Sequence, residues 1–267
     1  MKQSTIRRWG PWLALVVVFA IATSVLSWWQ FSRRAERVER IDQIVSNYDA
    51  APTPYSELSW LTNADGSSPL EWLPVEISGN YLPESALLVR NRPLSGQPGF
   101  LQLVPLLLDD GRIFIVERGW IAASSDISLP VSNPLPGAAP SQLVVRLRVG
   151  EPDVSRGEAE TLASINLEEI ALRLATFGVV ITEHYGRLAS ESPEYPETPL
   201  AMPKPSLSEG NHLSYAIQWI IFGVMAFIAF FWAYRNDRRV RLEAQGLLEP
   251  KTKKPTQADR DAEFEDA

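Results

Sequence analysis

The chain has 267 residues and a formal net charge of −7 at pH 7, which leaves room for one ordinary domain with appendages. It contains no cysteine, and this excludes disulfides, thiolate nucleophiles, cysteine-ligated zinc and iron–sulfur clusters. The acidic balance gives no support for nucleic-acid binding, which requires a basic face. Mean hydropathy is close to zero because two very apolar segments are averaged with a polar middle and a charged tail.

The first apolar segment runs from Pro11 to Trp29 without a charged residue. At 1.5 Å per residue this length matches a bilayer core of about 30 Å. Tryptophans lie at both ends, as in the aromatic belts of membrane helices. A cleaved secretory signal is the alternative, since basic residues precede the segment and Ala20-Ile21-Ala22 is a small-x-small site. The apolar run continues past that site, which favours a retained membrane helix.

A second apolar segment begins at His212 and has no charged residue from Leu213 to Tyr234. Aromatic residues again lie at both of its ends. We therefore predict two membrane helices, at residues 11–29 and 212–234, and two spans put both termini on one side of the membrane.

The distribution of basic residues predicts the orientation of this pair. Short basic clusters lie before the first helix and after the second, which by the positive-inside rule places both ends in the cytoplasm of a bacterial cell. Residues 1–10 and 235–267 are then cytoplasmic, and residues 30–211 lie outside the plasma membrane. Residues 245–267 are charged and nearly devoid of apolar side chains, so we predict disorder there. The basic residues are Lys2, Arg7 and Arg8 before the first helix, and Arg235, Arg238, Arg239 and Arg241 after the second.

The region between the two helices is predicted to be a small, mostly antiparallel α+β domain. The first helix is expected to continue outward with an amphipathic pattern as far as Tyr48, and residues 50–70 have the composition of a loop. An N-cap at Asn166 predicts one helix, and the proline-rich residues 190–208 are expected to return to the membrane in an extended form. Six segments have the β-rich composition of strands: Trp72–Ser78, Ala86–Asn91, Phe100–Leu108, Arg112–Trp120, Gln142–Val149 and Val179–Leu188.

Turn and alternation signals add detail to the sheet. Asp109-Asp110-Gly111 joins two β-rich runs and predicts a hairpin. Arg146 and Arg148 alternate with apolar residues, so we expect them on one exposed face.

Motifs for catalysis are scarce. The sequence has no glycine-rich phosphate loop, no HExxH and no GxSxG. His184 is expected to be a partly exposed histidine of a strand, although a dispersed Ser-His-Asp triad stays open as the alternative. We therefore predict that the protein is not an enzyme, and an extracytoplasmic hydrolase is the rival interpretation.

Two groups of arginines allow both a structural and a functional interpretation. Arg118-Gly119-Trp120 ends a predicted strand; a glycine bulge with a packed tryptophan and a salt bridge is one interpretation, and a contact surface for a partner is the other. Arg33 and Arg34, just outside the first membrane helix, are expected to reach lipid phosphates, or else the carboxylates of an amphiphilic ligand.

The start of the second membrane helix is the most distinctive stretch. At helical spacing, His212, Tyr215 and Trp219 share one face with Ala216 and Gly223, and Gln218 lies beside it. A polar side chain at that depth needs a partner, so this face is expected to meet the other helix or a ligand. A neutral imidazole beside an aromatic stripe suits the iron and the ring of a heme. The alternative is an interfacial belt that only anchors the helix.

Four ordered motifs resemble the surfeit locus protein one family, which assembles cytochrome c oxidase. The resemblance extends over residues 25–240. Glu117 stands where the family commonly has Asn, and residues 50–70 and the tail have no clear counterpart. The motifs are Trp29-Gln30-Phe31-Ser32-Arg33-Arg34; Gly79-Asn80-Tyr81-Leu82-Pro83 with Arg90-Asn91-Arg92; Gly99-Phe100 through Pro105, Asp110-Gly111 and Glu117-Arg118-Gly119-Trp120-Ile121; and His212-Leu213-Ser214-Tyr215-Ala216-Ile217-Gln218-Trp219.

This resemblance implies a two-span assembly factor that delivers heme a to the catalytic subunit of the oxidase, or stabilises it there. It implies His212 as the candidate iron ligand. Tyr215, Gln218 and Trp219 are then candidates for the heme face, and Arg33 and Arg34 for contacts with the propionates. The implied partners are oxidase subunits, the heme a synthesis machinery and the lipid bilayer. The alternative function is a membrane adaptor that holds oxidase subunits together without heme.

Overall fold

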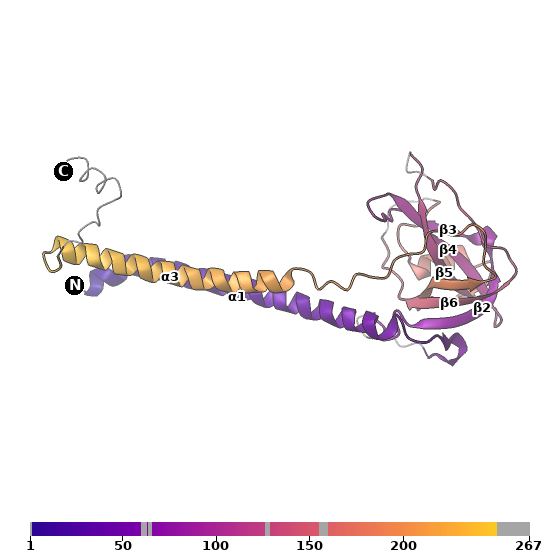
Figure 1. Ribbon diagram of the computed structural model, residues 1–267, viewed down its shortest axis with the longest axis horizontal. Coiled ribbons are helices and arrows are strands. Elements are labelled where there is room, and N and C mark those ends of the chain that lie inside the picture. Colours follow the sequence, from indigo (N-terminus) through magenta and orange to yellow (C-terminus); the bar gives the residue numbers. More distant parts are fainter. Residues whose placement is uncertain (1, 60–62, 64–65, 126–128, 155–159, 250–267) are drawn as a thin grey trace, which may run out of the picture. The chain divides into compact units, whose positions relative to one another are not determined.

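The computed structural model describes residues 2–59, 63, 66–125, 129–154 and 160–249 (Figure 1). The chain forms two compact units. The helical unit comprises residues 1–37 and 209–267, and the strand-rich unit comprises Val38–Ser208. The disorder predicted for the tail falls largely on residues 250–267, which lie outside the described residues.

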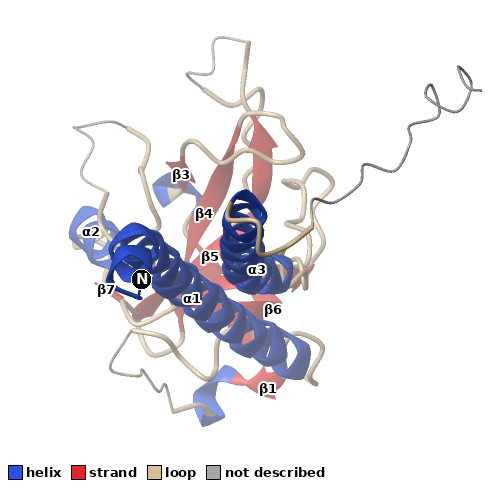
Figure 2. Ribbon diagram, turned by 90° about the vertical axis from the view of Figure 1, so that its left-hand side faces the viewer, coloured by secondary structure: helices blue, strands red, loops and turns tan. Residues whose placement is uncertain are grey.

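The helical unit consists of two long helices that lie side by side (Figures 1 and 2). Helix α1 covers Lys2–Asn47, and its first 36 residues belong to this unit, whereas α3 covers His212–Ala244. Both are long and apolar enough to cross a membrane. Their outward side chains are largely exposed and apolar, for example Trp28 and Ile228. Such a surface is unfavourable in water and suited to lipid, so the pair is consistent with a two-pass membrane protein.

Helix α1 continues past its apolar segment without interruption, as the sequence predicts. Its last turns belong to the strand-rich unit, where Ile44 and Tyr48 pack against Trp72 in a small apolar cluster. This packing anchors the last turn of α1 in the strand-rich unit through Ile44.

The strand-rich unit is built on an eight-stranded mixed sheet that closes on itself. Strand β2 pairs antiparallel with both β6 and β4, while β6 continues to β8, β8 to β5, and β5 back to β4. These five strands therefore form a closed barrel, a solution that removes exposed strand edges. The strands are β1 (Thr53–Pro54), β2 (Pro74–Tyr81), β3 (Leu87–Val89), β4 (Gly99–Leu108), β5 (Arg112–Ala122), β6 (Pro140–Arg148), β7 (Val179–Val180) and β8 (Tyr185–Ser192).

Strands β4 and β5 are buried on both faces. Phe114 and Val116 point to a cluster that gathers side chains of β2, β4, β5 and β6 inside the ring. Ile113 and Ile115 point the other way, to a second cluster that includes helix α2 (Leu167–Arg173). Helix α2 lies beside β7 (Figure 2). Burial on two faces explains why these strands are continuous apolar runs rather than alternating ones.

Most of the predicted elements are found. The hairpin at Asp109–Gly111 joins β4 to β5, with Gly111 at φ +83°. The N-cap prediction is confirmed, because the Asn166 side chain accepts a hydrogen bond from Glu169 N at 2.7 Å. The sheet is mostly antiparallel, with parallel pairings of β1 with β2 and of β5 with β7 and β8.

Three local predictions were wrong. The strand predicted at Val179–Leu188 is two strands, β7 and β8, because Ile181–His184 leave the sheet between them. The loop predicted at residues 50–70 contains strand β1 and the 3₁₀ helix η1 (Tyr55–Glu57). Arg146 and Arg148 do share a face, but that face is not open, since their guanidinium groups lie 3.9 Å from the ring centres of Tyr48 and Trp72.

Gly79 lies where the ring closes. A Cβ atom built on Gly79 would lie 2.4 Å from Leu107 O in β4, which is backbone and cannot yield. The pairing of β2 with β4 therefore requires glycine at this position, and this supplies a physical reason for the first residue of the Gly79-Asn80-Tyr81 motif.

We predict that Gly79→Ala lowers the free energy of unfolding by about 1–3 kcal/mol through overpacking. At roughly 2–4 °C per kcal/mol, the melting temperature of the full-length protein in detergent should fall measurably, as followed by tryptophan fluorescence. Ser78→Ala, an exposed change one residue earlier in the same strand, is the matched control. Equal melting temperatures for both variants would contradict the closure argument.

Candidate functional site

Small and polar residues line the contact between α1 and α3. Ser27 Oγ donates a hydrogen bond to Ala216 O at 3.0 Å, and both residues are buried. A Cβ atom on Gly223 would lie 2.9 Å from Thr23 Oγ1, so glycine lets the two helices approach closely at this point. Small residues with interhelical hydrogen bonds are typical of helix pairs in membranes, where apolar surface alone gives no preference for association.

His212 meets the other helix at the end of this contact. Its Nδ1 lies 2.9 Å from Oε1 of Gln30 in α1. Arg34, one turn further along α1, forms an ion pair with Glu209 at 2.7 Å. The prediction that a polar face at the start of α3 meets the other helix is therefore right for His212, and Gln30 is a partner that the sequence analysis did not identify.

The structure does not bring all the predicted heme-face residues to this contact. Tyr215 is 49% exposed, and Gln218 is also exposed on the outside of the helix pair. Trp219 is half-buried, and its ring makes an edge contact with Phe222 at 5.9 Å between centroids. Two surfaces of α3 are thus distinct: an inner one with His212, and an outer one with Tyr215 and Gln218.

The two arginines outside the first apolar segment are already paired. Arg33 Nη1 lies 3.0 Å from Glu36 Oε2, and its guanidinium lies 5.9 Å from the ring centre of Trp29. Arg34 is held by Glu209. A propionate or lipid phosphate that binds either arginine would compete with an internal carboxylate, so these contacts stay predictions.

In the strand-rich unit, Arg118 occupies a β-bulge. Gln102 pairs with Gly119 and Leu103 with Glu117, which leaves Arg118 as the extra residue of β5. Gly119 has φ +150°, and a Cβ there would lie 2.5 Å from Leu200 O. The bulge that the sequence suggests is thus present, and it turns the Arg118 side chain into the barrel.

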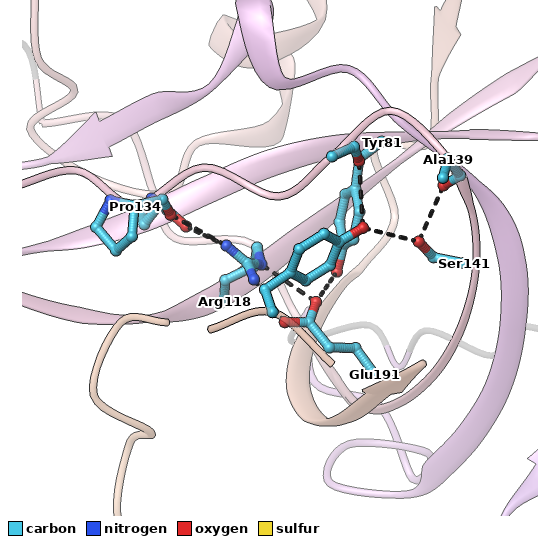
Figure 3. A network of polar contacts seen from close by, with 9 residues as sticks. Tyr81, Arg118, Pro134, Ala139, Ser141 and Glu191 are labelled. Atoms are coloured by element: carbon cyan, nitrogen blue, oxygen red, sulfur yellow. Dashed lines mark hydrogen bonds and ion pairs between the residues drawn. The ribbon is translucent and has the colours of Figure 1, made fainter. Parts of the chain in front are cut away.

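The Arg118 side chain is fully buried in a network of polar contacts (Figure 3). Its Nη2 lies 2.5 Å from Oε1 of Glu191 in β8, which is 6% exposed. The hydroxyl of Tyr81 in β2 donates to the same carboxylate at 3.0 Å, and Arg118 Nη1 donates to Gln102 Oε1 in β4 at 3.1 Å. Burial and the nearby Glu191 carboxylate raise the pKa of Tyr81. One guanidinium thus joins β5 to three other strands of the ring.

Trp120 packs where two of the four motifs meet. Its Nε1 donates to Arg92 O at 2.6 Å, and its backbone N donates to Leu200 O at 2.8 Å. A Cβ on Gly99 would lie 2.3 Å from the indole ring, so this glycine makes room for it. Arg118 and Trp120 are both buried. Their side chains make hydrogen bonds and packing contacts inside the domain. Partner binding through Arg118, Gly119 and Trp120 stays a prediction.

His184 is buried rather than partly exposed, and it precedes β8 instead of lying in a strand. Its Nε2 lies 2.9 Å from the hydroxyl of Tyr55. Burial lowers the pKa of His184 to about 4, opposed by Glu183 and assisted by Arg112, and burial raises the pKa of Tyr55 to about 12. The histidine is therefore neutral and paired with a tyrosine, which is not the arrangement of a hydrolytic triad.

The groove next to His184 has a volume of about 710 Å³. Its lining includes carboxylates from Glu76, Asp109 and Glu183. Among the described residues, no three histidines, aspartates or glutamates lie close enough to hold a metal ion.

Comparisons with known proteins agree with the motifs. A model of the SURF1 family, the surfeit locus protein one family of the sequence analysis, matches residues 17–224. A SURF1-like protein of Mycobacterium tuberculosis and one of Mycobacterium bovis, both named as uncharacterised, are 32% identical to this chain over 251 residues. The match covers 90% of this chain and 89% of each relative.

The buried neutral His184 predicts a loss of stability in acid. The pKa of this histidine is about 4 in the folded state against an ordinary 6.5, so its contribution is complete above pH 6.5. As the pH falls towards 4, the unfolded chain binds a proton that the folded chain does not, which costs about 3 kcal/mol at 1.36 kcal/mol per pKa unit.

The measurement is denaturant unfolding of the full-length protein in detergent between pH 7.5 and 4. His184→Gln keeps a partner for Tyr55 but cannot be protonated, so its unfolding free energy should decline less than that of the wild type across this range. Parallel pH profiles for the two proteins would show that His184 is not the responsible group.

Proposed function

The chain belongs to the SURF1 family, and from this premise we propose that it is a non-enzymatic assembly factor that delivers heme a to the catalytic subunit of cytochrome c oxidase or stabilises it there. The family is linked to oxidase assembly. The observation that supports the heme part of the proposal is the contact of His212 with Gln30 at the end of an apolar helix pair.

The protein acts from the bacterial plasma membrane in this proposal. Helices α1 and α3 cross the bilayer, with residues 1–10 and 235–267 in the cytoplasm and the barrel outside. The support is the basic clusters Arg7–Arg8 and Arg238–Arg239, which flank the two apolar segments on the side of the termini. The start of α3, with His212, then lies at the outer boundary of the hydrocarbon.

His212 is the residue that would hold the heme iron, and its surroundings fit this role. Its Nδ1 is occupied by Gln30, whereas Nε2 has no hydrogen-bond partner among the described residues. A neutral imidazole nitrogen is a common axial ligand of heme. Tyr215 and Trp219, on the adjoining surface of α3, would contact the ring, and Arg33 or Arg34 would reach a propionate by releasing its glutamate.

Heme a is cargo in this scheme, and the chain's own contribution is to bind, orient and release it. The barrel would contact oxidase subunits, or the machinery that makes heme a, at the outer face of the membrane. The groove beside His184 has no role in this proposal; its histidine lies 2.9 Å from the hydroxyl of Tyr55.

A second function is favoured by Gln218. This amide lies on the outside of the helix pair, where it has no hydrogen-bond partner among the residues that the structure describes. Uncompensated amides in apolar spans are costly and commonly face another helix. A heme-independent adaptor, bound through Gln218 to a membrane helix of an oxidase subunit, is therefore the alternative.

The orientation is tested with reporter fusions. Alkaline phosphatase fused after Ser141 should be active, because this residue would lie outside the membrane, and the same enzyme fused after Arg241 should be inactive. A β-galactosidase series at the same two positions should give the opposite pattern. Active phosphatase at Arg241 would reverse the proposed topology.

The heme function is tested in cells that make heme a. Deletion of the gene should lower cytochrome c oxidase activity and the heme a absorbance of membranes, while b- and c-type hemes remain. Wild-type protein purified from such cells should carry heme, and His212→Ala should lose most of the heme absorbance, because the coordinate bond to iron is gone.

His184→Gln is the matched control, since it alters the only other histidine of the chain and should leave the spectrum unchanged. If the deletion impairs the oxidase but the wild-type protein is colourless, the adaptor function is correct. Normal oxidase activity after deletion, in a genome without a second copy of the gene, would exclude the assembly role.

A further inference from the structure

The imidazole of His212 is held at one nitrogen only. Oε1 of Gln30 lies 2.9 Å from Nδ1. An amide oxygen can only accept a hydrogen bond, so this contact is a hydrogen bond in the tautomer that carries the proton on Nδ1. In a neutral imidazole the other nitrogen then has a free lone pair. The contact with Gln30 therefore favours the tautomer in which Nε2 has the free lone pair.

The free nitrogen is also left open by the local backbone. Gly210, at φ +72°, precedes the helix, and a Cβ atom on it would lie 3.8 Å from His212 Nε2. Because Gly210 has no side chain, no Cβ atom lies beside the Nε2 edge of the imidazole at this position. Helix α1 thus contacts the Nδ1 side of the ring, and glycine at position 210 keeps a side chain away from the Nε2 side.

Gln30 itself is fixed by the helix contact described above. Ser27, three residues before it in α1, is buried and bonded to Ala216. Since residues at i and i+3 lie on the same face of a helix, Gln30 is directed at the start of α3 by the same contact. The amide is therefore preorganised and not a flexible surface group.

We propose that Gln30 is a positioning residue: it accepts the Nδ1 proton of His212 and so presents Nε2 as the nitrogen that binds iron. This inference rests on the proposed heme function. Partners of this kind orient metal-binding histidines, fix their tautomer and strengthen the ligand, and their loss commonly weakens metal binding by about 10- to 100-fold. Because Gln30 is an uncharged acceptor, we expect an effect near the lower limit of that range.

The tautomer is measured without heme. Full-length protein labelled with ¹⁵N-histidine contains only two histidines, so its ring-nitrogen spectrum in detergent micelles can be assigned with the His184→Gln variant. For wild-type protein at pH 8, the His212 signals should show a protonated Nδ1 and an unprotonated Nε2. In Gln30→Leu both tautomers of His212 should be populated, with the proton on Nδ1 in some molecules and on Nε2 in others. A His212 protonated at Nε2 in the wild type would overturn the proposal, because the amide of Gln30 would then be donating to Nδ1.

Metal binding is measured by titration with hemin, followed by the Soret band. Gln30→Leu should raise the dissociation constant roughly tenfold. Gln30→Glu restores an acceptor and should bind hemin at least as tightly as the wild type, with a lower reduction potential because the ligand is more basic. A merely structural role for Gln30 would not move the potential.

Ser27→Ala is the control for helix packing, since it removes an interhelical hydrogen bond in the same contact but does not touch the imidazole. Its hemin affinity should fall less than that of Gln30→Leu, because the Gln30 side chain remains present to accept from the imidazole. Equal weakening by Ser27→Ala and Gln30→Leu, or no weakening by Gln30→Leu, would overturn the positioning role. A wild-type protein that binds no hemin would overturn the proposed heme function, whereas the nitrogen spectrum would still decide whether Gln30 sets the tautomer.

Discussion

A guanidinium with no exposed surface is stable in a protein only if other groups replace the water that it has lost. Arg118 meets this condition through Glu191, Gln102 and the carbonyl of Pro134, which come from β8, β4 and the loop before β6. Tyr81 from β2 completes the carboxylate's shell. These strands must come together for the charge to be compensated, so this single side chain links the closure of the barrel to the correct bulge in β5.

The helical unit follows the same principle with weaker groups. Within its apolar segments polar side chains are few, and two contacts on the inner surface pair such groups: Ser27 with a backbone carbonyl, and Gln30 with His212 at the segment end. Lipid gives apolar surface no reason to associate, so these contacts and the close approach at Gly223 determine how the helices pair. The histidine proposed to bind heme is thus part of the helix contact, and its free nitrogen is a consequence of that contact.

The two units have different roles in the proposed function. In the proposed topology the barrel is an extracytoplasmic body. Its motif residues mostly pack around Trp120 or compensate the charge of Arg118. The helix pair carries the groups that remain available, namely Nε2 of His212 and the amide of Gln218. A search for ligand or partner contacts should therefore concentrate on α3 before the β4–β5 hairpin.

Local patterns in the sequence were sufficient for the two apolar helices, the Asp109–Gly111 hairpin and the N-cap at Asn166, because each depends on neighbours within a few residues. They also identified His212 and the bulge at Gly119. The partners came only from the tertiary structure: Glu191 for Arg118, Gln30 for His212 and Tyr55 for His184 lie 73, 182 and 129 residues away. The burial of His184 and the break between β7 and β8 were likewise decided by long-range packing. The spacing of residues in the sequence predicts which side chains are neighbours along one helix or strand. Burial and charge compensation depend instead on which distant strands and helices pack together.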